Sequence, residues 1–318
     1  MSLMYGKNLA KWVVLGLAAA GAALSGCATN APRTTVVAEG VTRVELGSVK
    51  VTMLRDGAGS RVLDANFVRN AALADVQADL KAAGQPTDKL EVPYTTPVVD
   101  IGGQRVLFDT GNGEFGGASA GKLLENMLKA GIDPQSITAV VISHFHGDHI
   151  NGLRNKAGAV AFPNAKIYVP NPEWNWWMDE ARYAATPEAS RGGLNTARRV
   201  FTPMADKVIR FEPGKEVLPG VRSIAAFGHT PGHTVFMIEG GAKKLLYWAD
   251  TTNVAMFVRN PDWAVSFDMN AEEARATRRR IAELAIAENA LVAGFHLPGS
   301  AIGTLSVRDK GYDFTPLQ

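Results

Sequence analysis

Four side chains of the kind that bind metal ions lie within six positions of the chain: His144, His146, Asp148 and His149. Neutral imidazole and carboxylate are the usual ligands of zinc and of similar first-row divalent ions. His144 and His146 alternate along the chain and could bind one ion, while Asp148 and His149 could serve a second. A lone histidine would indicate a polar turn, but four such residues so close together favour a metal centre.

The residues around this motif predict where it lies in the fold. The apolar, β-branched run Thr138–Ile142 ends abruptly at the motif, which is typical of a buried strand that presents ligands from its C-terminal end. The remaining histidines, His229, His233 and His296, also lie in loops that contain Gly or Pro, and Asp250 follows another apolar run. Because strand ends converge on one edge of a sheet in α/β folds, we expect these residues to form one site.

The order His-x-His-x-Asp-His, then a distant His, an Asp and a last His, resembles the metallo-β-lactamase superfamily of two-metal hydrolases over residues 46–318. The resemblance implies an α/β fold, namely an αβ/βα sandwich of two mixed β-sheets flanked by helices. It also implies two zinc ions, although other divalent metals would suit the same ligands. The ligands that it implies are His144, His146 and His233 for one metal, Asp148, His149 and His296 for the other, and Asp250 bridging the two.

Within the superfamily, the chain looks most similar to methyl parathion hydrolase and to quorum-quenching lactonases. The similarity rests on the segments 228–234 (Gly-His-Thr-Pro-Gly-His-Thr), 291–298 and 303–314. It implies attack by a metal-bridging hydroxide, with Asp148 and Asp250 as the catalytic carboxylates and Asp148 also relaying a proton. Asp109, in an Asp-Thr-Gly turn, is expected to lie next to the metal ligands and to support them without binding a metal itself. His229 either orients a ligand or only hydrogen-bonds within its own loop.

Large apolar residues near the motifs are candidates for a substrate pocket: Phe115, Trp174, Trp177, Met256 and Phe257. Trp174 and Trp177 share one helix face, for which plain core packing is as good an explanation as a pocket wall. Because apolar candidates outnumber basic ones, we expect a small, neutral, apolar, ester-like substrate. Lactones, including acyl-homoserine lactones, and aryl phosphotriesters both fit. The alternatives are a periplasmic metallo-β-lactamase and a non-hydrolytic two-iron or ligand-binding lipoprotein.

The composition is that of one large globular domain and gives no sign of a nucleic-acid surface. The 318 residues carry a net charge of only +2, and 20% of them are charged. The one basic run, Arg278–Arg280, lies in a helical pattern with several glutamates, so we interpret it as a solvated helix face. Besides the substrate and a membrane, the expected partner is a second copy of the chain, by analogy with lactonase-like dimers.

The N-terminus has the features of a bacterial export signal. Lys7 and Lys11 precede an apolar run over residues 12–24, which is too short for a comfortable membrane span. Leu24-Ser25-Gly26-Cys27 then resembles a lipobox, in which Cys27, the only cysteine, is lipidated. We expect a lipoprotein signal peptide at 1–27, a flexible tether at 28–45 and the hydrolase domain at 46–318, anchored in the outer membrane and facing the periplasm. Ordinary secretion and an uncleaved anchor are the alternatives.

Hydrophobic periodicity and turn residues predict the elements that lead to the motif. We expect strands at 49–54 and 61–67, helices at 71–83 and 120–130, and a hairpin of 97–101 with 105–108 around Gly102 and Gly103. Further on, Asn270 with Glu273 three positions later predicts the capped start of a helix. The glycine-rich segment 111–117 lacks the lysine of a phosphate-binding loop, which argues against nucleotide binding.

Overall fold

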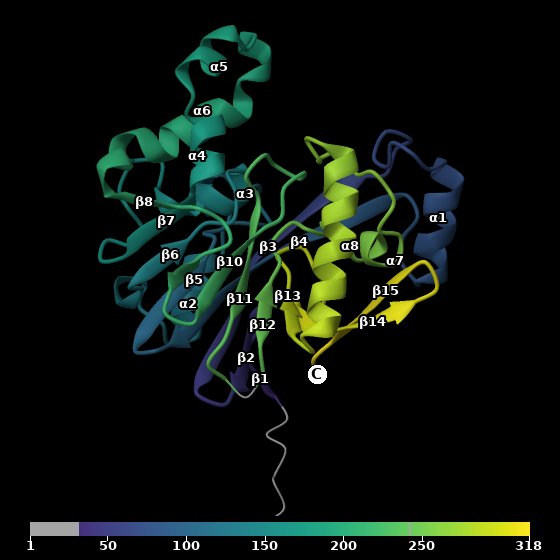
Figure 1. Ribbon diagram of the computed structural model, residues 1–318, viewed down its shortest axis with the longest axis horizontal. Coiled ribbons are helices and arrows are strands. Elements are labelled where there is room, and N and C mark those ends of the chain that lie inside the picture. The colour runs from purple at the N-terminus through teal and green to yellow at the C-terminus, as the bar shows by residue number, and fades with distance from the viewer. Residues whose placement is uncertain (1–31, 242) are drawn as a thin grey trace, which may run out of the picture. The chain divides into compact units, whose positions relative to one another are not determined.

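The computed structural model describes residues 32–241 and 243–318, which form two mixed β-sheets flanked by helices (Figure 1). The first sheet has its strands in sequence order: β1 (Arg33–Ala38), β2 (Val41–Leu46), β3 (Val49–Val62), β4 (Lys89–Ile101), β5 (Gln104–Phe108), β6 (Ala139–Val141), β7 (Lys166–Pro170) and β8 (Val208–Phe211). The second sheet has the order β15 (Gly311–Pro316), β14 (Ile302–Arg308), β13 (Leu291–Ala293), β12 (Leu245–Tyr247), β11 (Thr234–Ile238), β10 (Val221–Ala225) and β9 (Glu216–Leu218).

Helices occupy the connections between these strands and cover the outer faces of the sheets. They are α1 (Leu73–Ala82), α2 (Leu123–Lys129), α3 (Gly147–Ile150), α4 (Asn171–Trp177), α5 (Glu180–Ala185), α6 (Gly192–Phe201), α7 (Ala255–Arg259) and α8 (Ala271–Ala287). None of the helices in this part of the chain is long and apolar enough to span a bilayer.

The largest apolar core lies between the two sheets. Phe108 of β5 packs against Phe236 of β11 and Tyr247 of β12, with ring centroids 5.4 and 5.6 Å apart. Strand β6 is buried along its whole length and pairs in parallel with β5 and β7, which explains its continuous apolar sequence. A second core lies on the other face of the first sheet, beneath α2, α4 and α6. The predicted αβ/βα sandwich is therefore confirmed.

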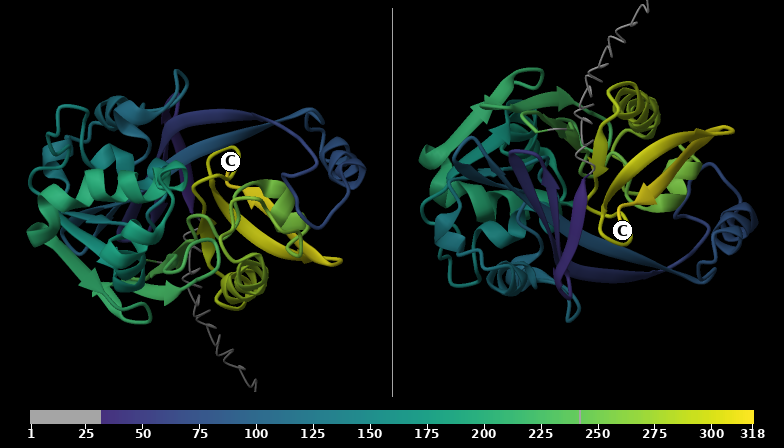
Figure 2. Two further views of the ribbon diagram at one scale, coloured as in Figure 1. Left: turned by 90° about the horizontal axis from the view of Figure 1, so that it is seen from above. Right: turned by 90° about the horizontal axis from the view of Figure 1, so that it is seen from below.

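Strands β3 and β4 form a long two-stranded ribbon that reaches past the rest of the first sheet toward α1 (Figure 2). The register shifts between Arg55 and Gly57, so the ribbon carries a β-bulge there. Gly57 has a φ of 142°, and a Cβ at this position would lie 2.1 Å from the carbonyl oxygen of Ser119, so only glycine fits. The bulge precedes Gly59–Arg61, which line the cavity described below.

Two predicted boundaries in this region are wrong. The expected tether at 28–45 instead contains β1 and most of β2, in which Val44 and Leu46 are buried in the core between the sheets and Val41 in the core on the other face. The expected strand at 61–67 is instead the end of a continuous β3 followed by a loop. The signal peptide at 1–27, Cys27 and the first residues of the tether lie outside the described residues.

The prediction of a solvated basic helix face is also wrong at one position. Helix α8 begins as expected, with the Asn270 side chain accepting a hydrogen bond from the backbone N–H of Glu273. Arg280 is exposed and Arg279 is partly exposed, but Arg278 is only 2% exposed. Its helix position lies on the same stripe as the buried Ile281, so a basic run in sequence is not one face in space.

Candidate metal centre

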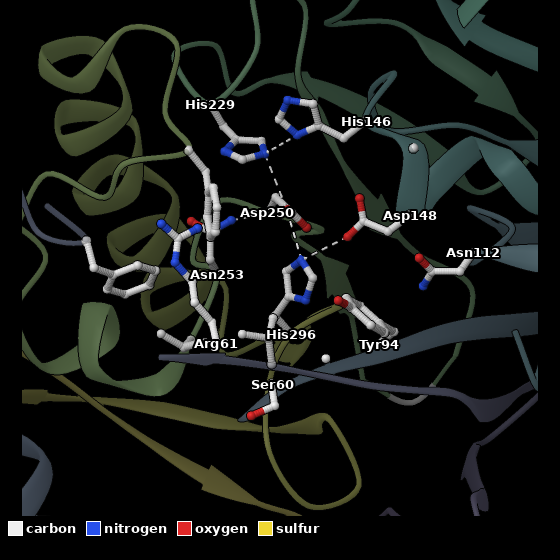
Figure 3. A pocket seen from close by; sticks show the side chains of 16 residues that line it. Ser60, Arg61, Tyr94, Asn112, His146, Asp148, His229, Asp250, Asn253 and His296 are labelled. Carbon is white, nitrogen blue, oxygen red and sulfur yellow. Dashed lines mark hydrogen bonds and ion pairs between the residues drawn. The ribbon is translucent and has the colours of Figure 1, made fainter. Parts of the chain in front are cut away.

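The predicted ligands come together where loops leave the adjoining strands of both sheets. The motif residues lie in the loop after β6 and in the short helix α3, whereas His229 lies in the β10–β11 loop. Asp250 follows β12 and His296 follows β13, which pair in parallel and therefore end at the same edge. Figure 3 shows the side chains of Asp148, Asp250 and His296 directed toward one another on the floor of a cavity.

The ligand atoms form two convergent groups that meet at one carboxylate. In the first, His146 Nδ1 lies 3.2 Å from His144 Nε2 and 2.9 Å from His229 Nε2, and His229 Nε2 lies 3.3 Å from Asp250 Oδ2. The second consists of Asp148, His149 and His296, whose donor atoms all lie within 4.8 Å of one another. Asp250 Oδ1 lies 3.1 Å from His149 Nε2 in this group, and Oδ2 lies 3.1 Å from His296 Nε2. Asp250 thus contacts both groups, as expected of the bridging residue.

His229 lies in the first group, where the sequence analysis expected His233. The Nδ1–H of His233 donates to the carbonyl of Ala226 at 3.0 Å, and its Nε2 accepts from the backbone N–H of Asp250 at 3.1 Å. Both ring nitrogens are therefore used, and burial together with the neighbouring His229 lowers the pKa of His233 to about 3, so the ring is neutral. His233 therefore contacts the Asp250 loop directly, and its assignment as a ligand stays a prediction.

Four of the five converging histidines are oriented in the same way. Each has its Nδ1 within hydrogen-bond distance of a fixed acceptor and therefore turns its Nε2 toward the centre. The acceptors are Ser143 Oγ for His144 (2.9 Å), Asp109 Oδ2 for His149 (2.8 Å), Asp268 Oδ1 for His229 (3.0 Å) and the Pro93 carbonyl for His296 (2.7 Å). Imidazole rings held in this way, with their Nε2 atoms turned to one place, are the arrangement in which histidines bind a metal ion.

Asp109 has the supporting position that was expected of it. It is fully buried, with φ at 59°, and its carboxylate accepts four hydrogen bonds. The donors are the Ser143 N–H (2.8 Å), the Ser143 hydroxyl (2.7 Å), His149 Nδ1 (2.8 Å) and the Tyr247 hydroxyl (2.6 Å). One carboxylate therefore fixes both the start of the motif loop and the His149 ring.

The sequence analysis missed a second buried carboxylate, Glu173, which it treated only as part of a helix start. Glu173 accepts hydrogen bonds from the backbone N–H of Phe145 (3.0 Å), the Thr230 hydroxyl (2.5 Å) and the N–H of Gly232 (2.6 Å). It therefore ties the motif loop to the loop that carries His229. A glutamate in the first turn of a helix gives no signal in sequence that distinguishes this role.

The residues fit a pair of divalent metal ions. Burial lowers the pKa of His144 and of His146 well below the usual range, so both are neutral and available as ligands. Burial alone would raise the pKa of Asp250, but His296 and His149 hold it well below its usual range, so it is ionised. Apart from their 3.1 Å contact with each other, His149 Nε2 and Asp250 Oδ1 are buried without a hydrogen-bond partner, as expected of metal-binding atoms. Neutral imidazoles with carboxylates are the donor set that zinc prefers.

Comparison with known proteins agrees with this geometry. Residues 93–291, more than half of the chain, match the family model described as the metallo-beta-lactamase superfamily. The chain belongs to this superfamily. The chain is 28% identical over 173 residues to an N-acyl homoserine lactonase from a Bacillus species, covering 48% of this chain and 61% of that protein. A ribonuclease Z from Pyrococcus horikoshii is 41% identical over a shorter stretch of 69 residues, which covers 22% of this chain and 19% of that protein.

Solved structures of superfamily members match most of the described chain. AidC, a dizinc quorum-quenching lactonase in complex with a hexanoyl-homoserine product, superposes with a TM-score of 0.82 at 26% identity. The superposition covers 88% of this chain and 98% of AidC. The hydrolase AbOPH matches with a TM-score of 0.81 at 24% identity, covering 88% of this chain and 98% of that one. The second match shows the shared fold alone.

In this superfamily member, the cavity above the ligands has a volume of about 510 Å³. Besides five of the ligand residues, it is lined by Gly59, Ser60, Arg61, Phe67, Val92, Tyr94, Asn112, Gly147, Asn253, Val254 and Phe267. The wall therefore comes mainly from the β3–β4 ribbon, more than forty residues before the motif, and from the segment after Asp250. The only sequence signal for this wall is the alternation of buried and exposed residues along the ribbon. That alternation does not show which face of the ribbon lies over the ligands.

None of the five predicted pocket residues lines this cavity. Phe115 lies under the Arg199 guanidinium at 3.7 Å, and Trp174 packs against Phe201. Trp177 is buried, and its ring packs edge-to-face against the His146 ring with centroids 6.0 Å apart. It therefore contacts a predicted ligand and does not line the cavity. The other two, Met256 and Phe257, are buried in a core beneath α7. Core packing therefore explains Trp177, Met256 and Phe257, whereas Trp174 is half-buried and Phe115 is exposed.

Proposed function

We propose that this protein is a dinuclear-zinc hydrolase that opens lactones of the acyl-homoserine-lactone kind. The observation that carries the proposal is a single carboxylate, Asp250, in contact with two ligand groups at the floor of a cavity with an apolar wall. The similarity to the Bacillus lactonase and to AidC supports it. Aryl phosphotriesters are the second candidate, because Phe67 and Phe267 line the same cavity and could pack against an aryl leaving group.

The cavity has two chemically different sides. Figure 3 shows Arg61 on one side of Asp250, and Tyr94 and Asn112 on the other. The Arg61 guanidinium lies 5.1 Å from the ring centre of Phe67 and 4.8 Å from that of Phe267, so the apolar wall is on the Arg61 side. A neutral substrate would therefore place its acyl or aryl group against this wall and its ester group above Asp250.

Two zinc ions at this centre would supply Lewis acidity and a hydroxide at neutral pH, because zinc lowers the pKa of bound water from about 15.7 to about 7. Asp148 is the ligand best placed to move a proton, since its side chain is 25% exposed at the cavity and its Oδ2 lies 3.5 Å from His296 Nε2. Burial and the charges of Asp148 and Asp250 raise the pKa of Tyr94 to about 12. Its hydroxyl thus stays protonated and can donate a hydrogen bond to a substrate oxygen.

The test is kcat/KM of the zinc-loaded protein lacking residues 1–27, measured against one substrate panel. The panel contains short- and long-chain acyl-homoserine lactones, an aryl lactone, methyl paraoxon and a carbapenem. A lead of a hundredfold for a lactone, about 2.7 kcal/mol in transition-state binding, supports the proposal. The same lead for methyl paraoxon selects the second candidate, and a carbapenem lead selects a periplasmic metallo-β-lactamase.

A protein with no activity on the panel although both metals are bound would refute the substrate assignment. Bound iron with a visible absorption band would instead support the non-hydrolytic alternative. The matched control is Asp250→Asn, which keeps the shape of the side chain and removes the bridging charge. Its activity should fall below a tenth of the wild-type value on every substrate.

We also propose that the protein is exported and anchored through a lipid on Cys27, with residues 1–27 as the signal peptide. This proposal rests on the basic start, the short apolar run and the lipobox-like Leu24-Ser25-Gly26-Cys27. Alanine rather than aspartate after Cys27 resembles the sorting signal for the outer membrane. A homodimer is a further expectation by analogy, which light scattering of the protein without residues 1–27 would test.

A further inference from the structure

Arg278 is a buried cation that the proposed chemistry does not use directly. Its side chain is 2% exposed, in contrast to Arg280 two positions later on the same helix. Removing a guanidinium from water is costly unless its donors are all hydrogen-bonded. A buried arginine therefore needs a full set of hydrogen-bond acceptors. The segments that supply these acceptors are the ones that the arginine links.

The acceptors of Arg278 lie in three different segments. Its Nε donates to the carbonyl of Thr251 at 3.1 Å, the residue directly after Asp250. Its Nη1 donates to the carbonyls of Pro261 at 2.7 Å and Trp263 at 2.9 Å. Its Nη2 donates to Asp268 Oδ2 at 3.2 Å. The guanidinium thus joins the Asp250 loop, the segment after α7 and a buried aspartate.

The aspartate continues the connection to the metal centre. Asp268 is 1% exposed at its side chain, and its other oxygen, Oδ1, accepts the Nδ1–H of His229 at 3.0 Å. The Nε2 of the same imidazole faces the first ligand group. Two connections therefore start from Arg278, one through Asp268 to His229 and one through the Thr251 carbonyl to Asp250. They end at ligand atoms that lie 3.3 Å apart.

We propose that Arg278 is a positioning residue that holds His229 and Asp250 as one unit and thereby sets the affinity of the centre for its metal. The inference rests on the proposed metal-dependent function. A rigid planar fork is required, because one group must reach carbonyls and a carboxylate in fixed directions at once. A lysine ammonium has the same charge but only three donors at a single point, so it cannot replace all of these bonds. Asp268 in turn holds His229 Nδ1 at 3.0 Å and so fixes the ring with its Nε2 toward Asp250.

The test compares Arg278→Lys with the matched control Arg280→Lys, which makes the same chemical change on the same helix at an exposed position. Zinc affinity of the full-length protein is measured by competition with a chromophoric chelator, and substrate is not needed. We expect Arg278→Lys to lower the affinity about 10- to 100-fold. Arg280→Lys should stay within twofold of wild type. An Arg278→Lys affinity within twofold of wild type would overturn the inference.

A second variant separates positioning from folding. Asp268→Asn removes the charge between Arg278 and His229 and allows the amide to present a donor to the imidazole. It should lower zinc affinity by a similar factor, and the melting temperatures of all metal-free variants are recorded alongside. If Arg278→Lys is unfolded at the assay temperature, the zinc affinity of Asp268→Asn is the deciding measurement. A wild-type zinc affinity of Asp268→Asn would overturn the inference. A wild-type protein that binds no divalent metal would refute the proposed function and this inference together, whereas equal affinities in all four proteins refute only the inference.

Discussion

Replacing His229 or His233 separately by alanine tests the assignment of the metal ligand most directly. The two histidines lie four positions apart in one loop, and both are buried. His229→Ala removes an Nε2 that lies 2.9 Å from His146 Nδ1 and 3.3 Å from Asp250 Oδ2, so the first ligand group loses one of its four members. We expect the bound zinc to fall from two ions to one and kcat/KM to fall at least about 100-fold, or about 2.7 kcal/mol.

His233→Ala should have a different effect, because this residue bonds only to the backbone. The change leaves the Ala226 carbonyl and the Asp250 N–H without partners in a buried place. Each lost partner costs about 1–3 kcal/mol, so the total is about 2–6 kcal/mol of unfolding free energy. In a protein of this size, about 2 °C of melting temperature is lost per kcal/mol, which predicts a drop of roughly 4–12 °C. Zinc content should remain close to two ions.

Zinc content by elemental analysis and thermal melting of the metal-free forms would distinguish these outcomes. Both variants are measured at matched protein concentration after the same dialysis, with wild type beside them. A His233→Ala protein that loses one zinc ion while His229→Ala keeps two would reverse the assignment and refute the reasoning from hydrogen bonds. Equal loss of zinc in both would show that the loop acts as a unit and that the two roles are not separable.

Three other changes test separate parts of the structure. Glu173→Ala leaves three buried donors unpaired and should lower the unfolding free energy by at least about 3 kcal/mol, measured by urea unfolding, while the exposed Glu180→Ala should change it by less than about 0.5. Tyr94→Phe should reduce kcat about tenfold with unchanged zinc content, and an unaltered kcat would exclude the hydroxyl as a donor. Cys27→Ala in the full-length chain should abolish labelling with a radioactive fatty acid and release the protein from membranes, whereas persistent labelling would disprove lipidation at this residue.

The fold and the convergence of most of the predicted ligands could be predicted because the decisive signals are local. Imidazole and carboxylate at fixed spacing after a short apolar run are uncommon outside metal sites, and the run itself predicts a buried strand. The same logic located Asp250 and His296 at strand ends, where the parallel pairing of β12 and β13 brings them together. The hairpin turn at Gly102 and Gly103 was equally local, and both residues have positive φ in the structure, at 56° and 77°.

The errors share a physical cause, which is that partners distant in sequence decide the roles of local residues. The orientation of the His229 ring, which the sequence analysis left open, depends on Asp268, 39 positions away. Whether an arginine of the basic run is solvated depends on where acceptors such as the Thr251 carbonyl lie in the fold. The tether prediction failed for the same reason, since a small, polar sequence forms β1 and β2 once β3 offers a strand to pair with.

The composition of the cavity wall changes how the substrate should be recognised. Aromatic content near the motif suggested a tryptophan-lined pocket, but the tryptophans pack inside and the wall is built by Arg61, Phe67, Tyr94 and Phe267. A wall with a cation over two neighbouring phenyl rings can accept an apolar group and also a carbonyl oxygen at its edge. A plain hydrocarbon ester would use only the first of these interactions. If the proposed function holds, we expect esters with a second carbonyl near the scissile one, as in an N-acyl lactone, to be better substrates than esters that offer apolar surface alone.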